Sequence, residues 1–408
     1  MRPSILFRRF QLVRRGNIGL QRTPTRILSR ILPVSFLILG LYGCSLNPSP
    51  SSGPAPALSV ATVKDLGVIQ TNPDILGRDG GYSALFQGYS VWLYGDSFLS
   101  KPNAEDETLI SDSWSFTTNL NAQDEINGFQ ERLDSSGAPT MILPLTAAEQ
   151  AFNQAHNGNN CQEQPCGARW ALWPSSIVVN PANNSALIFY MLVSAKPGNF
   201  NFQGVGDSVA VWRQFQQQPQ RPTLNPPIVP DHPDLLFTQN EPSFGSASLV
   251  SNGTLYAYGC GYNSGCKLGK VAPSSAQNRS AWSFYAGNGN WSSQISDSVT
   301  VFNDANILSI SWNAFLQCYL AVYSPPFSQN VVMRTSPNPE GPWSSEVVAF
   351  VAMQPTTGNV YDALAHVEYD SNGGQTIYVS YSRSTPAPFT SQVRLVAVEF
   401  QSSNAQPR

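Results

Sequence analysis

The chain has 408 residues, of which 41% are hydrophobic and only 12% are charged, and its formal net charge is −3 at pH 7. This length suits one large all-β domain or two ordinary domains. Residues 1–44 contain eight arginines and no acidic residue, so the rest of the chain carries a net charge of −11. An acidic domain argues against nucleic-acid binding, which requires Lys and Arg to neutralise phosphates.

The amino-terminal segment has the pattern of an export signal. Its arginines precede an apolar run, residues 31–41, that is shorter than the roughly 20 residues needed to span a bilayer. The run leads into Leu-Tyr-Gly-Cys at positions 41–44, which resembles a bacterial lipoprotein signal ending in a lipidated cysteine. The alternative is an ordinary cleaved signal with a chance cysteine at Cys44.

These patterns predict three parts in the chain. They are a lipoprotein signal peptide over residues 1–43, a flexible Pro/Ser/Gly-rich tether over residues 44–60 and a folded domain over residues 61–402. We therefore expect a protein of the bacterial cell envelope, either lipid-anchored at Cys44 or secreted after removal of the signal peptide. Its contact with the membrane would be through the lipid anchor only.

Beyond the tether, strand and turn signals dominate, and a single short helix is expected over residues 146–154. One unit, a polar opening followed by a strand, a turn and further strands, recurs five times. The five copies span residues 79–98, 170–212, 244–271, 307–335 and 363–400. Such repetition predicts an all-β fold, a five-bladed β-propeller of four-stranded antiparallel blades. The alternative is a β-sandwich with many hairpins, which would not require the same unit five times.

The cysteines form two close pairs in turn-rich loops. Cys161 lies near Cys166, and Cys260 lies near Cys266, so both pairs suit local disulfides in an exported protein. Cys318 falls in an apolar strand and is expected to be a buried thiol. Zinc is disfavoured because the pairs lack the CxxC spacing and the chain has only three histidines.

The first unit contains the strongest candidates for catalysis. A polar turn with Arg78 and Asp79 opens its first strand, and Asp96 follows its second strand after a glycine. A hairpin in this register brings Asp79 and Asp96 towards the same end of a sheet, and two neighbouring carboxylates are the minimum equipment for cutting a glycosidic bond. The alternatives are a structural ion pair between Asp79 and Arg78, and an Asx-turn at Asp96 that closes the blade.

Other candidates lie at the openings of later units. Arg169 with Trp170 and Trp173 could form a platform for sugar rings, although tryptophans also pack blades together. Glu241 precedes a proline, which fixes it in extended backbone at a strand entrance, and its alternative is a solvated loop residue. Asp362 is a further acid at the mouth of the fifth unit.

Several motifs resemble the five-bladed β-propeller glycoside hydrolases, the family-43-like arabinanase and furanosidase superfamily that includes the domain family linked to endo-D-arabinanases. The resemblance covers roughly residues 65–400 and rests on the order of the motifs. Those motifs are Arg-Asp-Gly-Gly at 78–81, Tyr-Gly-Asp-Ser-Phe at 94–98, Ser-Trp-Asn at 311–313, Tyr-Leu-Ala-Val-Tyr at 319–323 and the segment 334–343 that ends in Glu-Gly-Pro-Trp. Trp312, within the third motif, joins the sugar-binding candidates.

The resemblance implies roles for individual residues. Asp79 matches the aspartate base of the first blade, and Glu241 matches the glutamate acid of the third blade. The second-blade acid is missing from residues 169–176, so Asp96 is the candidate partner carboxylate. His366 resembles the axial histidine that points towards a central metal ion or water cluster, and a satisfied core histidine is the equally weighted alternative.

The resulting hypothesis is an exported glycoside hydrolase that cleaves a polysaccharide or oligosaccharide, with arabinan-type furanosides favoured. We expect a monomer with no required cofactor and leave open a central Ca²⁺ or other ion. One alternative is a non-catalytic carbohydrate-binding propeller on the cell surface, and a third is an envelope scaffold that binds protein. Phosphate-binding loops, a G-x-S-x-G elbow and an H-E-x-x-H motif are all lacking in the sequence.

Overall fold

The structure is a computed structural model, and it describes residues 58–401 with the exception of residues 71, 199–200, 262 and 355–358. The expected signal peptide, the lipidation site Cys44 and most of the expected tether lie outside the described residues. Within the described part of the chain, no helix combines the length and apolar character needed to cross a membrane.

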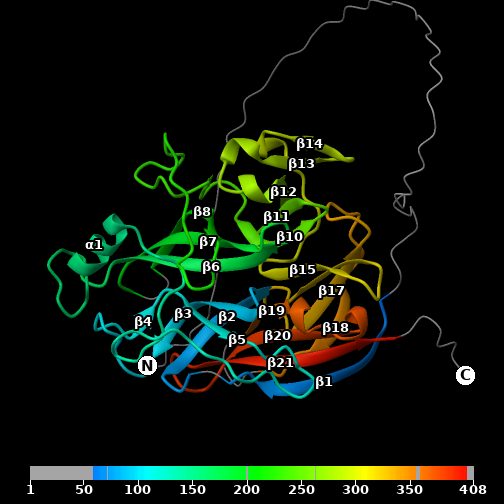
Figure 1. The fold of residues 1–408 in the computed structure, drawn as a ribbon, viewed down its shortest axis with the longest axis horizontal. Helices are drawn as coiled ribbons and strands as arrows, with labels where there is room; N and C mark the ends of the chain where they lie inside the picture. The colour runs from blue at the N-terminus through cyan, green and yellow to red at the C-terminus, as the bar shows by residue number, and fades with distance from the viewer. Residues whose placement is uncertain (1–57, 71, 199–200, 262, 355–358, 402–408) are drawn as a thin grey trace, which may run out of the picture. The chain divides into compact units, whose positions relative to one another are not determined.

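The described strands form five antiparallel sheets, which we call blades 1 to 5 in chain order (Figure 1). Blade 1 contains β2 (Ile75–Phe86), β3 (Tyr89–Leu99), β4 (Leu109–Ile110) and β5 (Ser113–Thr117). Blade 2 contains β6 (Arg169–Asn180), β7 (Ser185–Ala195), β8 (Phe202–Trp212) and β9 (Phe237–Thr238). Blade 3 contains β10 (Phe244–Ser251), β11 (Thr254–Gly261), β12 (Gly265–Val271), β13 (Ser283–Gly287) and β14 (Asn290–Ser292).

Blades 4 and 5 complete the fold. Blade 4 contains β15 (Leu308–Asn313), β16 (Cys318–Tyr323), β17 (Asn330–Ser336) and β18 (Val347–Val351). Blade 5 contains β19 (Val360–Ala365), β20 (Thr376–Ser384) and β21 (Ser391–Phe400), together with β1 (Val60–Val68) from the start of the described chain.

The first strands of the five blades form a closed ring. β2 contacts β6, β6 contacts β10, β10 contacts β15, β15 contacts β19, and β19 contacts β2 again. This closure confirms the predicted five-bladed propeller and shows that the β-sandwich alternative was wrong. Blade 3 departs from the prediction because β13 and β14 extend it to five strands among the described residues.

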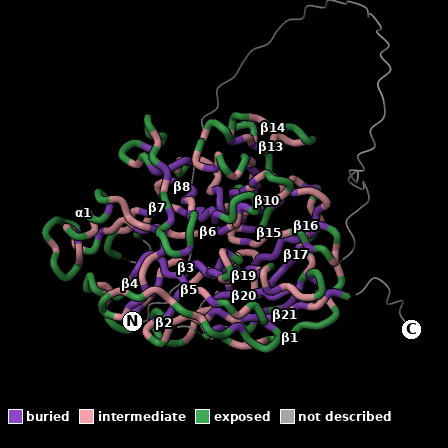
Figure 2. The backbone as a smooth tube through the Cα atoms, in the orientation of Figure 1, coloured by how far each residue is buried: buried purple, intermediate pink, exposed green. Residues whose placement is uncertain are grey.

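The strands form where apolar side chains are covered on both faces by neighbouring blades. In β7 the run Ala-Leu-Ile-Phe-Tyr from residue 186 is fully buried, as expected for a strand in the middle of a packed sheet. Burying each large apolar side chain stabilises the fold by about 1.5–3 kcal/mol. Buried residues accordingly follow the strands, while the connecting loops are largely exposed (Figure 2).

Blade 5 is closed by pairing the first described strand with the last. β1 runs antiparallel to β21, with Thr62 opposite Glu399 and Val63 opposite Val398. The sequence reading did not anticipate this closure, because it began the repeated units at residue 79. The pairing ties both ends of the domain into one sheet.

Each blade is an antiparallel sheet whose first strand lies at the centre of the ring. The five inner strands therefore run in the same direction. At the end where these strands turn into hairpins, neighbouring blades touch: Gln87 Nε2 donates to Asn184 O at 3.2 Å, and Ser251 Oγ lies 2.7 Å from Tyr319 Oη. Asn313 Nδ2 likewise donates to Gly374 O at 2.8 Å. We call this side of the ring the hairpin end, and the side where the inner strands begin the acid end.

The predicted helix is present as α1 (Ala147–Ala155). Thr146 caps it, since its side chain accepts from the backbone N–H of Glu149 while the Glu149 carboxylate accepts from the backbone N–H of Thr146. Such a reciprocal capping box satisfies two helix N–H groups that otherwise lack partners. The local sequence was therefore sufficient to find this helix.

Both expected disulfides are present among the described residues. Cys161 is bonded to Cys166, and Cys260 is bonded to Cys266. The second bond joins residues that face each other in the β11–β12 ladder. Cys318 is a buried free thiol, as predicted.

Candidate active site

Asp79 lies at an irregular point of β2, at the acid end. The register between β2 and β3 shifts on both sides of Gly80, and Gly80 and Gly81 have φ values of 88° and 112°. Residues with a Cβ rarely adopt these angles, so the two glycines permit the distortion. Bulges of this kind redirect neighbouring side chains. Here the Asp79 carboxylate lies against Gly95, where an added Cβ would be 2.8 Å from Asp79 Oδ1.

Asp96 follows Gly95 directly and is held by the neighbouring blade. Its Oδ1 accepts from Arg169 Nη2 at 3.2 Å and from Trp173 Nε1 at 3.1 Å, both in β6. The Asp96 side chain is 22% exposed, so solvent reaches it. Gly95 therefore separates two carboxylates at one end of the ring, as the sequence predicted for Asp79 and Asp96.

A third carboxylate reaches the same place from blade 5. Asp362, in β19, has a φ of 53°, and its Oδ2 accepts from the backbone N–H of Gly80 at 3.1 Å. Asp362, the acid predicted at the mouth of the fifth unit, therefore contacts the residue that follows Asp79 in the chain. Blades 1 and 5 together supply three aspartates to the acid end.

Arg78 does not lie with the three aspartates, although the sequence placed it beside Asp79 as a candidate substrate contact. Its side chain is buried, pairs with Glu131 at 2.7 Å and lies over the Tyr94 ring at 3.5 Å. Successive residues of a strand point to opposite faces, so Arg78 is directed into the blade, away from the face that carries Asp79. The prediction that Arg78 contacts substrate is therefore not supported by its position.

The structure adds a buried carboxyl that the sequence reading missed. Ser97 pairs with Ile110 and Tyr94 pairs with Ser113, which places Ser111–Asp112 opposite Gly95–Asp96. Asp112 is fully buried, and its Oδ1 accepts from Ile142 N at 2.6 Å. Burial, with a smaller contribution from the charge of Asp96, raises the pKa of Asp112 to about 8. Its Oδ2 has no hydrogen-bond partner among the described residues.

Glu241 belongs to a different cluster, within blades 2 and 3. Its Oε1 pairs with Arg279 Nη2 at 2.7 Å and its Oε2 accepts from Thr238 N at 2.8 Å. Both oxygens are thus engaged by protein donors, which leaves neither free to present a proton to a substrate. The assignment of Glu241 as the catalytic acid remains a prediction that this geometry does not favour.

A second missed carboxyl lies beside Glu241. Asp207, in β8, is buried and accepts from Ser243 Oγ at 2.7 Å. Burial, aided by the charge of Glu241, raises the pKa of Asp207 to about 7. Nothing in the local sequence Gly-Asp-Ser distinguishes this residue from an ordinary turn aspartate, and only its tertiary surroundings reveal it.

The aromatic candidates divide between two locations. Trp173 stands beside Asp96 and packs edge-on against Phe202. Trp170 instead packs on Phe152 of α1 and on His232, so its contacts are those of a packing residue. Trp312 lies at the end of β15, at the hairpin end, where it is 45% exposed. Trp312 therefore lies at the opposite end of the ring from Asp79 and Asp96, although the sequence analysis assigned all three to one site.

His366 is a core residue instead of an axial ligand. It is fully buried and stacks on Trp92 at 3.9 Å. Its Nδ1 lies 2.7 Å from Ser83 Oγ and its Nε2 lies 2.8 Å from Ser380 Oγ, so both ring nitrogens are occupied. Burial lowers the pKa of His366 to about 3, which keeps the ring neutral. The geometry therefore supports the alternative of a satisfied core histidine.

One cluster of described residues has the composition of a metal site. Ligand atoms of Glu149, His232 and Asp234 lie within 4.8 Å of one another. Arg221, however, forms ion pairs with both Glu149 and Asp234. This guanidinium already pairs with both acids, so we interpret the cluster as a buried ion-pair network.

The comparison with protein families identifies the chain. A family model described as "Domain of unknown function (DUF4185)" matches residues 67–390. The chain belongs to the DUF4185 domain family. No curated protein sequence matches this DUF4185 chain.

Solved structures resemble the DUF4185 propeller at low sequence identity. A Bacteroides ovatus ATCC 8483 protein, whose assignment as a hydrolase is provisional, is 14% identical with a TM-score of 0.52, covering 82% of this chain and 87% of its own. Zg3597, a family 117 glycoside hydrolase of Zobellia galactanivorans, is 11% identical with a TM-score of 0.48. The match covers 83% of this chain and 90% of Zg3597. A GH43_1 enzyme of Xanthomonas citri, solved with xylotriose, is 11% identical with a TM-score of 0.46. The match covers 82% of this chain and 90% of the Xanthomonas enzyme. The first of these likenesses supports the fold alone.

Proposed function

We propose that this protein is an exported glycoside hydrolase that cleaves a polysaccharide, with arabinan-type furanosides as the favoured substrates. The observation that carries the proposal is the placement of Asp79 and Asp96 on either side of Gly95, at a bulge on the acid end of the ring. Carboxyl pairs on a rigid scaffold are the usual catalytic equipment of glycosidases. The motif resemblance to propeller glycoside hydrolases covers the same residues.

The two carboxyl groups would divide the chemistry. One would protonate the glycosidic oxygen as it leaves, and the other would activate water or attack the anomeric carbon. Two N–H donors, from Arg169 and Trp173, converge on Asp96 Oδ1. This arrangement suits an oxygen that carries negative charge, so we assign Asp96 the base or nucleophile role. Asp79 would then supply the proton, in place of the base role that the motif resemblance implies for it.

A second candidate function is carbohydrate binding without turnover. It is favoured by the absence of an acid from residues 169–176 and by the engagement of both Glu241 oxygens. In that case the acid end would bind a sugar through its aspartates, Arg169 and Trp173. The two functions differ in whether any glycan is cleaved.

The test is reducing-sugar release from arabinans, xylans and galactans by the wild type and by matched amide variants. We expect Asp79→Asn and Asp96→Asn each to lower the rate by about 10²–10⁴-fold, the usual range for loss of an acid–base group. Glu241→Gln should remain within about tenfold of the wild type, because both oxygens are already engaged. Asp124→Asn is the control, since this side chain is 91% exposed. Binding of a glycan without release of sugar from any substrate would replace the hydrolase with the binding protein.

Export and lipid anchoring are part of the proposal and have their own test. The lipoprotein-like pattern at positions 41–44 supports anchoring, and the two disulfides suit an oxidising compartment. Replacing Cys44→Ala should move the protein from the membrane fraction to the soluble fraction of the expressing cell. An unchanged distribution would contradict the anchor without affecting the hydrolase assignment.

A further inference from the structure

Two loops at the acid end each present an exposed phenylalanine ring. One loop, residues 324–329, joins β16 to β17 in blade 4, and the other, residues 385–390, joins β20 to β21 in blade 5. In blade 4 the start of the inner strand faces the end of the second strand, with Leu308 opposite Tyr323, and blade 5 has the same arrangement. Both loops therefore lie at the end where the inner strands begin. We call them the phenylalanine loops.

The phenylalanine loops share a sequence and a backbone conformation. Each contains Pro-Phe followed by Ser or Thr, at residues 326–328 and 388–390. Phe327 and Phe389 have φ values of 61° and 60°, in the left-handed region that a bulky residue rarely adopts. Their side chains are nevertheless 59% and 56% exposed. An aromatic ring held towards solvent on an unfavourable backbone, in the same loop of two successive blades, indicates a role in binding instead of in packing.

The loop that carries Phe389 is fixed beside the candidate catalytic hairpin. Ser391, directly after this loop, accepts from Arg78 N at 2.9 Å and donates to Arg78 O at 2.7 Å. The Phe389 ring packs against Phe98, with ring centroids 4.9 Å apart. Arg78 precedes Asp79 in β2, and Phe98 lies in β3 of the same hairpin. The exposed ring therefore adjoins the strands that carry the catalytic candidates.

The loop that carries Phe327 borders the third aspartate. Ala363 N donates to Ser324 Oγ, in this loop, at 3.4 Å. Ala363 directly follows Asp362, whose carboxylate accepts from the backbone N–H of Gly80. The two phenylalanine loops thus adjoin the group of three aspartates from blades 4 and 5.

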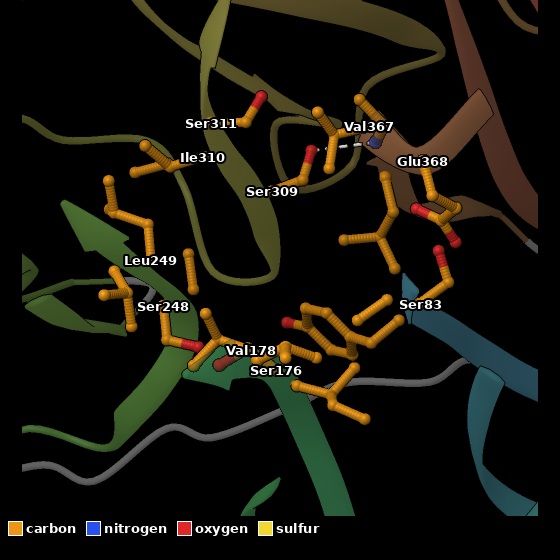
Figure 3. Close-up of a pocket in the computed structure, with 18 of the residues that line it drawn as sticks. Ser83, Ser176, Val178, Ser248, Leu249, Ser309, Ile310, Ser311, Val367 and Glu368 are labelled. Atoms are coloured by element: carbon orange, nitrogen blue, oxygen red, sulfur yellow. Dashed lines mark hydrogen bonds between the residues drawn. The ribbon is translucent and has the colours of Figure 1, made fainter. Parts of the chain in front are cut away.

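Trp312 provides a contrast at the other end of the ring. It is 45% exposed and lines the central cavity, which Figure 3 shows in close-up. None of Asp79, Asp96 and Asp362 is among the described residues that line this cavity. Phe327 and Phe389 differ from Trp312 because their loops adjoin carboxylates that can bind the polar part of a ligand.

These surroundings restrict the chemistry of a partner. The negative charges of the aspartates would repel an anion. A purely apolar partner that covered the rings would also remove water from the neighbouring carboxylates, which is costly. A sugar chain suits both features, since its C–H faces can stack on aromatic rings while its hydroxyl groups donate to carboxylates. The acid end therefore favours a neutral glycan.

We propose that Phe327 and Phe389 bind the part of a neutral polysaccharide chain that extends from the aspartates over blades 4 and 5. This inference rests on the proposed function, and it adds how the chain is held next to the bond that is cleaved. A phenyl ring has no acid–base group, so both residues would supply affinity and take no part in the chemistry. Chains that reach the rings should bind more tightly than short fragments.

The test is calorimetry on the Asp79→Asn/Asp96→Asn protein, which should leave the probes uncleaved. The probes are the disaccharides and hexasaccharides of arabinan, xylan and galactan. We expect the further changes Phe327→Ala and Phe389→Ala together to weaken hexasaccharide binding at least tenfold and to affect disaccharide binding less. Replacing Phe327→Tyr and Phe389→Tyr keeps both rings and should retain the affinity within about threefold. Trp312→Ala removes an exposed ring at the opposite end and is the matched control, with no expected effect.

Three results would overturn the proposal. The first is no binding of any hexasaccharide, and the second is equal hexasaccharide affinity with and without the two phenylalanines. The third is the same loss of affinity in the alanine and tyrosine variants, which would indicate a disturbed loop instead of a lost stacking face. Vesicles of phosphatidylethanolamine and phosphatidylglycerol are tested in parallel, and phenylalanine-dependent vesicle binding together with the second result would assign the loops to a membrane surface.

Hydrolysis by the wild type is measured separately, so the two ideas can fail independently. Sugar release combined with hexasaccharide binding that does not depend on Phe327 and Phe389 would remove this inference and leave the hydrolase. Phenylalanine-dependent binding without sugar release from any substrate would remove the hydrolase and leave a glycan-binding surface at the acid end.

Discussion

The Arg169 guanidinium of blade 2 donates to the Asp96 carboxylate of blade 1, with Nη2 3.2 Å from Oδ1. Its Nη1 also donates to Leu109 O in β4 at 3.1 Å. One side chain therefore links two blades and orients the carboxylate between them. The orientation of Asp96 depends on how these blades pack together, in addition to the hairpin that carries it.

Replacing Arg169→Lys should reduce catalysis more than stability. Lysine offers a single ammonium and cannot keep both contacts in the fixed geometry of a guanidinium. We expect kcat/KM to fall about 10–100-fold, since small displacements of a reacting group have effects of this size. Stability should change by about 1 kcal/mol or less, because the pair is partly exposed. Arg334→Lys, which alters the pair with Glu346 in blade 4, is the control, and an equal loss of activity there would contradict the positioning role.

Adding a methyl group at Gly95 should disable the site without unfolding the blade. A Cβ at this position would lie 2.8 Å from Asp79 Oδ1, which is too close for a normal contact. The carboxylate must move, so we expect Gly95→Ala to lower kcat/KM by about 10²-fold. Gly158→Ala is the matched control, because an added Cβ there meets nothing within 4 Å. Unchanged kinetics in Gly95→Ala would show that Asp79 does not act from this position.

The buried carboxyl of Asp112 should make stability depend on pH. Between the ordinary aspartate pKa of 3.8, which applies to the unfolded chain, and the folded pKa of about 8, the folded state holds a proton that the unfolded state has released. The free energy of unfolding therefore falls as pH rises through this window, by about 1.4 kcal/mol per pH unit. Asp112→Asn cannot lose this proton, so urea unfolding from pH 5 to pH 7 should show a smaller loss than in the wild type.

A suitable control for that experiment is Asp134→Asn. Although burial alone would raise the pKa of Asp134, hydrogen bonds from Ser136, Ala104 and Ala138 lower it to about 2. Its contribution is complete above pH 4 and is lost only as pH falls towards 2, so the slope between pH 5 and pH 7 should match the wild type. A parallel slope in Asp112→Asn would mean that Asp112 is ionised in the folded protein.

Removing the cation from the buried network should be costly. Arg221 pairs with Glu149 and Asp234, and all three side chains are at most 6% exposed. Arg221→Met leaves two buried carboxylates without their counter-ion, so we expect a loss of about 3–5 kcal/mol in urea unfolding. Arg334→Met removes a more exposed pair and should cost about 1 kcal/mol or less. Equal losses in the two variants would contradict the importance of burial.

The sequence predicted the blades because their central strands carry long apolar runs, such as that in β7, separated by turn residues. It did not predict β1, whose residues are mostly exposed and whose partner lies at the other end of the chain. An edge strand of this kind has no apolar pattern to identify it. Its role follows only from the closure of the ring.

The part of the candidate site that depends on local sequence was predictable, and the part that depends on tertiary packing was not. Asp79 and Asp96 stand on one hairpin, so local register was sufficient to bring them together. Asp112 and Asp207 differ from turn aspartates only in what surrounds them after folding, and burial cannot be read from a flanking serine. The sequence left His366 open between an axial role and a core position, and it could not place Trp312, since a motif does not state which end of the ring its residues reach.

The closure of blade 5 also bears on how the protein is made. Thr62 in β1 and Glu399 in β21, which are hydrogen-bonded to each other, are 337 residues apart in the chain. At synthesis rates of about 5–20 residues per second, the first strand waits roughly 20–70 s before its partner exists. During this interval β1 is a strand without a sheet, and any agent that shields nascent edges would act on this segment before the ring can close.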